Sequence, residues 1–383
     1  MSSADADVIV LGAGAMGTAA AYHLAHRGAR VVVLDRWSPP HTHGSSHGRT
    51  RIIREAYFEH PAYVPLVRRA YALWSDLERE SGRRLFLRTG GLTLGAEHGI
   101  LVPGALRSAR EHGVWHETLT GREIARRFPA LRADPDTIGV LEQRAGILFA
   151  ESCVEAMRDG ARAHDARLHY GERAQEWRVD GATVTVTTDR AAYHARRLIL
   201  AAGAWLPVLA PSLGVELRVE RQVAHWMAPG ENPSLVDAGH LPVTLVEYDA
   251  GRMFYAIPDV GDGLKAAIHH DGPTVDPDVP PAPVTAAETE VLMRLVERFL
   301  PCAAGAVRDQ STCLYTNTPD GHFILDAHPG APEVIVVSAC SGHGFKFAIA
   351  IGEVLADIAL NGEASIDLSP FRLSRFASER LDA

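Results

Sequence analysis

The stretch that decides the fold is residues 7–17, DVIVLGAGAMG. A short apolar run typical of a β-strand leads directly into the glycines Gly12, Gly14 and Gly17, and residues 18–28 then favour a helix that ends at a glycine. A second apolar run, residues 29–35, ends at Asp35, near the spacing of roughly 20 residues at which an acid follows such a glycine turn. The order strand, turn, helix, strand predicts a Rossmann-like dinucleotide-binding unit.

Each part of this unit has a physical role. Glycines let the backbone approach a pyrophosphate, and the N-terminus of the helix supplies free N–H groups and the positive end of the helix dipole. Asp35 is placed to accept hydrogen bonds from a ribose 2′-hydroxyl, and it would repel the 2′-phosphate of NADP. FAD and NAD use the same unit, so the motif leaves both open.

Composition and charge set the broad class. The chain has 383 residues, 46% of them hydrophobic and 22% charged, which is typical of globular proteins, and the length favours two domains. A net charge of −9 gives no indication of binding to nucleic acid or to an anionic membrane. The N-terminus does not resemble a secretory signal, and no uninterrupted run reaches the roughly 20 apolar residues of a membrane span. We therefore expect a cytoplasmic protein.

The cysteines and histidines do not predict a metal site. Four scattered cysteines form no CxxC pair, so zinc and thioredoxin-like motifs are not expected. His41, His43 and His47 lie close together but lack a neighbouring acid or cysteine that would complete a ligand set.

The rest of the chain shows two kinds of segment. Strand and turn patterns recur at residues 195–205, which end in a loop containing Gly203, and at 333–360, a strand, a glycine loop and a helix. Helices are expected at 62–82, 121–131 and 285–300, and strands at 86–95 and 183–188. These patterns predict an α/β fold with an α+β catalytic part. A discontinuous cofactor domain at 1–85, 146–215 and 308–383 holds an inserted substrate domain, built on a mixed β-sheet, at 86–145 and 216–307.

Lysine is almost absent from this chain. Of the 38 lysines and arginines, only Lys265 and Lys346 are lysines. Lysine is a compact charge whose pKa shifts readily on burial, whereas arginine stays charged and presents a wide planar fork. Two lysines in an arginine-rich chain therefore indicate sites where arginine would fail. His269 lies four residues after Lys265, so the two point the same way in a strand and are neighbours in a helix.

A basic segment follows the second predicted strand. Residues 44–57, GSSHGRTRIIREAY, carry Arg49, Arg51 and Arg54, the last two of which would share a face of a helix. Charge alone leaves two readings: a solvated basic loop, or a positive patch for an anionic flavin ring or a carboxylate.

Four motifs together carry a family resemblance: GSSHGRTRIIR, GLKAAIH, CLYTNTPDGHFILD and SGHGFKF. In this order they resemble the monomeric sarcosine oxidase and N-methyltryptophan oxidase family, within the wider D-amino-acid-oxidase-like flavoproteins, and the resemblance covers essentially the whole chain. It implies an FAD-dependent amine oxidase that converts a secondary amino acid such as sarcosine to an imine and reduces O2 to H2O2. The cofactor domain is then an FAD-binding domain.

The resemblance also implies a role for individual residues. Cys313 would form a thioether to the flavin, Arg54 and Lys346 would bind the substrate carboxylate, and Lys265 would lie where oxygen is reduced. Arg51 would pack against the ring, and Tyr255 and His269 would lie near the substrate amine. The further flavin-side positions implied by the resemblance are His47, Tyr315 and Thr316, and the cofactor-binding glycines are Gly12, Gly14, Gly17, Gly203, Gly342 and Gly344.

Several points stay open at the level of sequence. Arg49 and Cys340 depart from the family pattern near the site, so the substrate side chain is not fixed: sarcosine, N-methyltryptophan, pipecolate and other cyclic imino acids are all compatible. The alternatives outside the family are an NAD-dependent dehydrogenase and a non-catalytic dinucleotide-binding protein. The expected partners are the amino-acid substrate and O2, with no nucleic acid and no membrane, and the expected state is a monomer.

Overall fold

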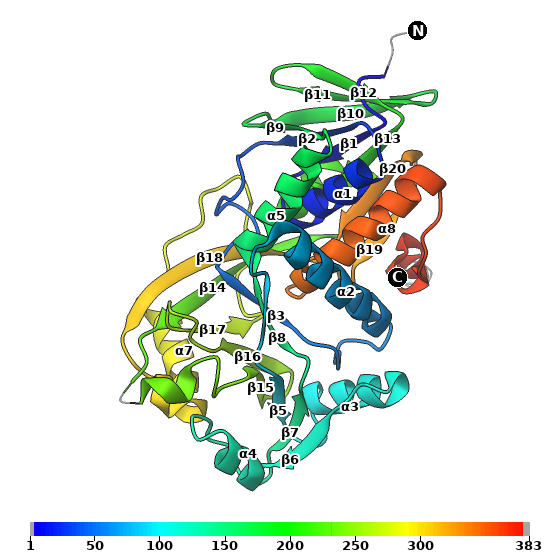
Figure 1. Ribbon diagram of the computed structural model, residues 1–383. Helices are drawn as coiled ribbons and strands as arrows, with labels where there is room; N and C mark the ends of the chain where they lie inside the picture. The colour runs from blue at the N-terminus through cyan, green and yellow to red at the C-terminus, as the bar shows by residue number, and fades with distance from the viewer. Residues whose placement is uncertain (1–3, 231, 378–383) are drawn as a thin grey trace.

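The computed structural model describes residues 4–230 and 232–377. Two large sheets dominate it (Figure 1), one covered by helices α1, α2, α5 and α8 and the other carrying the helices α3, α4 and α7. The helices are α1 (Ala15–His26), α2 (Tyr63–Ser81), α3 (Leu101–His112), α4 (Gly121–Arg127), α5 (Ala150–Ala163), α6 (Leu206–Leu209), α7 (Ala286–Phe299) and α8 (Ala348–Asn361).

The first sheet has six strands and contains the glycine turn. All neighbouring pairs are parallel except the first in the order below, which joins an antiparallel edge strand. Its spatial order is β19 (Ile324–His328), β20 (Ala331–Ser338), β13 (Arg197–Leu200), β1 (Val8–Leu11), β2 (Val31–Asp35) and β9 (Arg167–Tyr170). Strands far apart in the sequence therefore meet beside β1, which confirms the Rossmann-like and discontinuous character of the cofactor domain.

Alternation along β1 explains how this sheet is buried on both faces. Val8 and Val10 pack among the helices, whereas Ile9 and Leu11 pack beneath a small antiparallel sheet on the opposite face. That covering sheet is formed by β10 (Ala174–Asp180), β11 (Thr183–Thr188) and β12 (Ala192–Ala195). A strand with two buried faces needs a continuous apolar run, which is what residues 8–11 provide.

The second sheet has eight strands and is mixed, as expected for the substrate domain. One pair, β15 with β5, is parallel, and the others are antiparallel. The order is β18 (Val307–Asn317), β14 (Arg218–Met227), β17 (Leu264–His269), β16 (Arg252–Ile257), β15 (Val243–Asp249), β5 (Gly91–Gly95), β7 (Ile138–Glu142) and β6 (Glu117–Thr120). A three-stranded sheet of β3 (Thr50–Ile53), β8 (Gly146–Phe149) and β4 (Phe86–Arg88) lies between the two large sheets (Figure 1).

Local differences from the expected elements have simple causes. The helix after the glycine turn begins at Ala15 rather than residue 18, and α4 ends at Arg127 because Pro129 cannot continue a helix. The expected strand 86–95 is two strands in different sheets, separated where Gly90 takes φ = +74°. Arg51 lies in strand β3, so the helical face that it could have shared with Arg54 does not exist.

Strand β18 crosses an expected domain boundary. Residues 308–317 were assigned to the cofactor domain, but the structure pairs them with β14 in the eight-stranded sheet, over the register Trp226–Asp309 to Arg218–Asn317. The partner strand β14 lies about 90 residues earlier in the chain, so a local sequence pattern does not reveal this pairing. Residues 1–3 and 378–383 of the expected segments lie outside the described residues. Among the described residues, no helix is both long and apolar enough to cross a bilayer.

Candidate active site

A cavity of about 520 Å³ runs from the carboxyl ends of β1 and β2 to the inner face of the eight-stranded sheet. It brings together residues from the whole length of the chain. The sequence-predicted residues that line it are Gly12, Gly14, Asp35, His47, Arg51, Arg54, Gly203, Tyr255, Lys265, His269, Cys313, Tyr315, Thr316, Gly342, Gly344 and Lys346. Gly17 and Arg49 do not line it.

The glycine turn at one end of the cavity leaves no room for side chains. Gly12 has φ = +100°, and a Cβ there would lie 2.4 Å from the Ala201 carbonyl oxygen on the neighbouring strand end. A Cβ on Gly17 would lie 1.8 Å from the Gly12 oxygen, so Gly17 seats α1 against the turn rather than facing the cavity. The backbone is therefore open to a closely approaching ligand, as a pyrophosphate requires.

The substitution Gly12→Ala should remove bound FAD and destabilise the protein. Alanine at a positive φ costs about 1–3 kcal/mol, and the clash with Ala201 adds to it. Flavin absorbance per mole of purified protein and the thermal unfolding midpoint measure the two effects. Gly28→Ala is a matched control, because Gly28 also has a positive φ of +78° but its Cβ would meet nothing within 4 Å. Equal flavin content in both variants would contradict this account of the turn.

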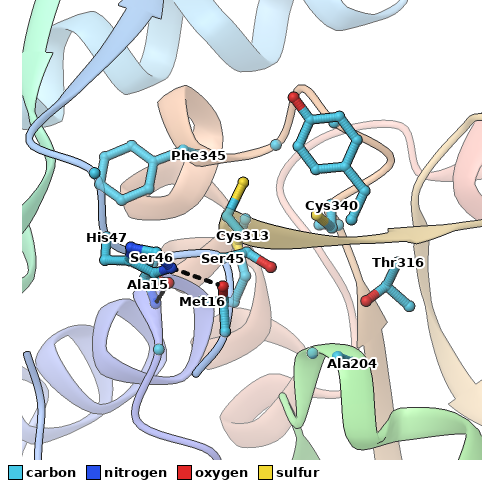
Figure 2. A pocket seen from close by; sticks show the side chains of 18 of the residues that line it. Ala15, Met16, Ser45, Ser46, His47, Ala204, Cys313, Thr316, Cys340 and Phe345 are labelled. Atoms are coloured by element: carbon cyan, nitrogen blue, oxygen red, sulfur yellow. Dashed lines mark hydrogen bonds between the residues drawn. The ribbon is translucent and has the colours of Figure 1, made fainter. Parts of the chain in front are cut away.

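Asp35 and Ser46 complete the nucleotide end. Asp35 accepts hydrogen bonds from the N–H groups of Ala13, at 2.6 Å, and Trp37, at 2.7 Å. Burial raises the pKa of Asp35, and these N–H donors oppose the increase. Ser46 Oγ accepts the N–H of Ala15 at 2.9 Å, at the first residue of α1 (Figure 2). Carboxylate, hydroxyl and helix N-terminus fit the ribose and phosphate parts of a dinucleotide.

The strand register of the eight-stranded sheet explains why one of its faces carries the reactive side chains at the other end of the cavity. Tyr255 lies directly opposite Ala267, and Trp226 opposite Lys265, so both share a sheet face with Lys265 and His269. The same alternation brings Cys313 and Tyr315 of β18 to this face through the pair Gln222–Cys313. Residues 265–269 therefore lie in a strand, one of the two possibilities that the sequence left open, and Lys265 and His269 point to the same face.

Lys265 is buried, with 3% of its surface exposed, and its ammonium is held by backbone carbonyls. Nζ donates to Gly48 O at 2.7 Å and to Thr50 O at 3.0 Å, and it lies 5.1 Å from the centre of the Trp226 ring. Burial lowers the pKa of Lys265 well below its ordinary value, and the positive charge of Arg51 adds to this. A small cation that responds strongly to its surroundings is thus fixed at the cavity wall.

Arg51 is also fixed by carbonyl groups. Its guanidinium donates to Thr50 O at 2.9 Å, to Ser45 O at 2.8 Å and to His47 O, and it lies 5.7 Å from the Phe345 ring centre. Because these acceptors are uncharged, the Arg51 cation is not neutralised by them and adds to the positive potential of the cavity.

Arg54 and Lys346 both lie close to the Tyr57 ring. The Arg54 guanidinium carbon is 4.2 Å, and Lys346 Nζ 5.2 Å, from the Tyr57 ring centre. Arg54 donates to Glu59 at 2.7 Å, and Lys346 donates to the Tyr57 hydroxyl at 3.2 Å and to His343 O at 2.7 Å. Burial and, after it, the positive charge of Arg54 lower the pKa of Lys346 to about 7, and Glu59 opposes the decrease. The structure therefore brings together Arg54 and Lys346, the two cations that the family resemblance implies as a carboxylate-binding pair.

Three residues of this cluster were not anticipated. Glu59 lies beside Arg54 with 12% of its side chain exposed, and Tyr57 donates to or accepts from His343 Nδ1 at 2.7 Å. Burial would raise the pKa of Glu59, but the Arg54 and Lys346 cations hold it below its ordinary value. Burial lowers the pKa of His343 to about 3, which keeps its ring neutral. A signal was present in the sequence, because Tyr57 and Glu59 follow Arg54 closely in the segment REAYFEH.

Cys313 and Cys340 lie near each other at the middle of the cavity, in the region of Ser45, His47 and Phe345 (Figure 2). Cys340 Sγ is 3.9 Å from Leu314 O, the residue next to Cys313. Burial raises the pKa of the Cys313 thiol, and the nearby cations Arg51 and Lys265 oppose the increase. Burial dominates, so the free thiol stays protonated, and the two cations are the groups that would stabilise a thiolate once it forms.

Arg49 lies outside the cavity, behind its wall. Its guanidinium stacks at 4.6 Å on the Trp226 ring and pairs with Asp309, with Asp262 3.8 Å away. The Arg49 side chain, one of the two departures from the family pattern, therefore lies against the cavity wall at Trp226. Within residues 4–230 and 232–377, no group of three or more histidine, cysteine or acidic residues is arranged to hold a metal ion.

A cavity that joins a dinucleotide-binding end to a wall of cations fits a dinucleotide-dependent oxidoreductase, and comparison with known proteins identifies a flavin-dependent one. The family model described as FAD dependent oxidoreductase (DAO) matches residues 7–358, so the chain belongs to this family. The chain is 38% identical over 377 residues to monomeric sarcosine oxidase of Streptomyces avermitilis, which covers 97% of this chain and 98% of that one. It is 33% identical to N-methyl-L-tryptophan oxidase of Salmonella dublin, over 97% and 99% of the two chains.

Solved structures with the same fold support this assignment at the level of architecture. NikD, an amino acid oxidase essential for nikkomycin biosynthesis, has a TM-score of 0.83 at 24% identity, and covers 97% of this chain and 98% of its own. L-proline dehydrogenase from P. horikoshii has a TM-score of 0.86 at 19% identity, over 98% and 99% of the chains. The comparisons favour FAD over the nicotinamide-dependent alternative.

Proposed function

We propose that this protein oxidises a secondary amino acid, N-methylated or cyclic, to an imine and reduces O2 to H2O2. One observation carries the proposal: two buried cations, Arg54 and Lys346, line the cavity whose sheet face presents Lys265, in a chain of the FAD-dependent family. Bound FAD supplies the two-electron acceptor. The proposal places its nucleotide along Gly12, Gly14 and Asp35, and its reactive ring among Arg51, Lys265 and Cys313.

Arg54 and Lys346 bind the substrate carboxylate in this account. Both are charge-assisted donors that converge from different elements, and they fix the direction in which the amine and its neighbouring carbon point. Arg54 already shares one edge with Glu59, which holds the guanidinium in place before substrate arrives. The clamp gives selectivity for amines that carry a carboxylate.

Tyr255 and His269 face the substrate amine. Burial, followed by His270 and the nearby cations, lowers the pKa of His269 well below its ordinary value, so its ring stays neutral. Surrounding positive charge also favours loss of the ammonium proton from the substrate, which must be neutral before hydride leaves its α-carbon. A neutral histidine and a tyrosine provide polar contacts without adding a charge that would repel or trap the amine.

Lys265 stabilises the negative charge that oxygen gains when it is reduced. The ammonium is fixed by carbonyls before the reaction, so it needs no reorganisation as that charge develops. Cys313 is proposed as the attachment point of FAD, through a thioether from Sγ to the 8α-methyl carbon. That bond removes one hydrogen from the thiol and one from the methyl group, and O2 accepts the two electrons.

A peroxide-release screen tests the proposed function. Sarcosine, N-methyltryptophan and pipecolate should be compared with glycine, a primary amino acid, and with dimethylamine, which lacks the carboxylate. At least one of the first three should release peroxide much faster than both controls. A preference for dimethylamine, or dependence on added NAD, would overturn the proposal. The relatives named monomeric sarcosine oxidase also support a monomer, and the cytoplasmic location stays a prediction from the sequence.

The affinity for carboxylates should depend on the charge of Lys346. Because the pKa of Lys346 is about 7, an amine-free carboxylate should bind best below that pH and more weakly as Lys346 loses its proton above it. Lys346→Met should weaken this binding about 10- to 100-fold at pH 6 and remove the pH step. Spectral titration with propionate measures both effects. A variant that keeps the wild-type affinity and pH dependence would exclude Lys346 from the clamp.

A further inference from the structure

The turn at residues 48–50, called here the lysine turn, wraps around the Lys265 ammonium. Its first and last carbonyls are the two acceptors of Lys265 Nζ, at 2.7 and 3.0 Å. Its middle residue, Arg49, has φ = +67°, a left-handed conformation that residues with a side chain rarely adopt. Such a conformation costs on the order of 1–3 kcal/mol and persists only where neighbouring groups hold it.

The N-terminus of α5 holds this turn from behind. Glu151 Oε1 accepts the N–H groups of Gly48, at 2.8 Å, and Arg49, at 3.0 Å. The N–H of Ala150 donates to the Arg49 carbonyl at 2.9 Å. One carboxylate oxygen therefore binds the first two N–H groups of the lysine turn, while the Gly48 and Thr50 carbonyls of the turn accept from Lys265.

We propose that Glu151 is a positioning residue for Lys265, which fixes the lysine turn and keeps the ammonium protonated at the place where oxygen is reduced. Glu151 does not line the cavity, so it acts through the turn and through its charge rather than by touching substrate or cofactor. The inference rests on the proposed role of Lys265.

Among the charged groups around Lys265, Glu151 is the acid that raises the pKa of the lysine. Arg51 of β3 and Arg49 of the turn are positive, whereas Glu151 of α5 opposes their effect on the pKa of Lys265; Cys313 of β18 also faces Lys265 but carries no charge once it is a thioether. Glutamine at position 151 keeps an oxygen that accepts the same two N–H groups but removes the negative charge. Without that charge the pKa of Lys265 falls further, and the ammonium is lost at a lower pH.

The low lysine content makes a direct measurement possible. Protein labelled with ¹³C at the lysine ε-carbon gives two side-chain signals, and Lys265→Met assigns them. In the FAD-loaded Glu151→Gln variant the Lys265 titration midpoint should fall by on the order of 0.5 pH unit or more, and the Lys346 midpoint should stay unchanged. The pH above which reaction with O2 slows should fall by the same amount. Glu155→Gln is the matched control, since Glu155 lies one turn later in α5 and pairs with Arg83 at 2.6 Å.

The outcomes separate this inference from the proposed function. An unchanged Lys265 midpoint in Glu151→Gln, or an equal change in Glu155→Gln, overturns the role of Glu151 even where Lys265→Met slows the oxygen reaction. Failure of Lys265→Met to slow that reaction selectively removes the proposed role of Lys265 itself. If Glu151→Gln does not fold, Glu151→Asp, which keeps the charge, should retain the wild-type midpoint, and a lowered midpoint there contradicts the inference.

Discussion

Acid precipitation of the Cys313→Ala variant should give a colourless pellet and a yellow supernatant, whereas the unmodified protein should give a yellow pellet. The proposed thioether is the bond that resists denaturation, and alanine has no sulfur to form it. Non-covalent FAD should still bind the folded variant, because the glycine turn and Asp35 lie at the other end of the cavity. Flavin absorbance in the two fractions measures the effect, which should be a complete loss of attachment.

Cys340→Ala is the appropriate control for this experiment. Cys340 lines the same cavity and its sulfur is close to the backbone of β18, so it tests whether any thiol near the ring would serve. Its pellet should stay yellow. A yellow pellet from Cys313→Ala together with a colourless one from Cys340→Ala would move the attachment to the second cysteine.

Lys265→Met should slow the reaction with oxygen by about 10²- to 10³-fold, the effect of removing one preorganised donor from a reacting centre. Methionine keeps much of the side-chain volume but leaves the carbonyls of Gly48 and Thr50 without their ammonium partner. The anaerobic half of turnover, followed by loss of flavin absorbance with substrate, should change far less, because Arg54 and Lys346 are intact.

Lys265→Arg tests whether a guanidinium can replace the ammonium at this position. The cradle formed by two carbonyls and the Trp226 ring suits a compact ammonium, and the wider guanidinium would have to displace the lysine turn. Arginine should therefore fail to restore the oxygen reaction. Equal slowing of both halves of turnover in Lys265→Met would contradict the proposed role, and full rescue by arginine would contradict the reason given for the retained lysine.

The nucleotide end of the fold is predictable from sequence because its determinants are local. Gly12, Gly17 and Asp35 lie within one strand–turn–helix–strand unit, and the contacts of Gly17 with Gly12 and of Asp35 with Ala13 are made inside that unit, whereas Gly12 also meets Ala201 of a neighbouring strand. The scarcity of lysine was informative for a different reason: Lys265 and Lys346 are both buried, in surroundings that shift their pKa values, where a guanidinium would not be equivalent. Composition thus indicated two positions that structure brings to one cavity.

The residues that escaped prediction act across long distances in the chain. Glu151 is about 100 residues from the turn that it holds, and His343 is 286 residues from Tyr57. The strand β18 reaches the eight-stranded sheet through pairing with β14, which no local pattern shows. A mostly buried acid such as Glu59 looks like any surface glutamate in the sequence, and only packing against Arg54 shows its function.

Anaerobic mixing of the purified yellow protein with sarcosine and, separately, with dimethylamine tests the central claim most directly. The two amines differ chiefly in the carboxylate that Arg54 and Lys346 are proposed to bind. The flavin absorbance should bleach with sarcosine, or with N-methyltryptophan or pipecolate in its place, and admission of oxygen should then restore the colour with release of one peroxide per bleached flavin. Failure of every carboxylate-bearing secondary amine to bleach the flavin, or bleaching by dimethylamine at the same rate, would contradict the account.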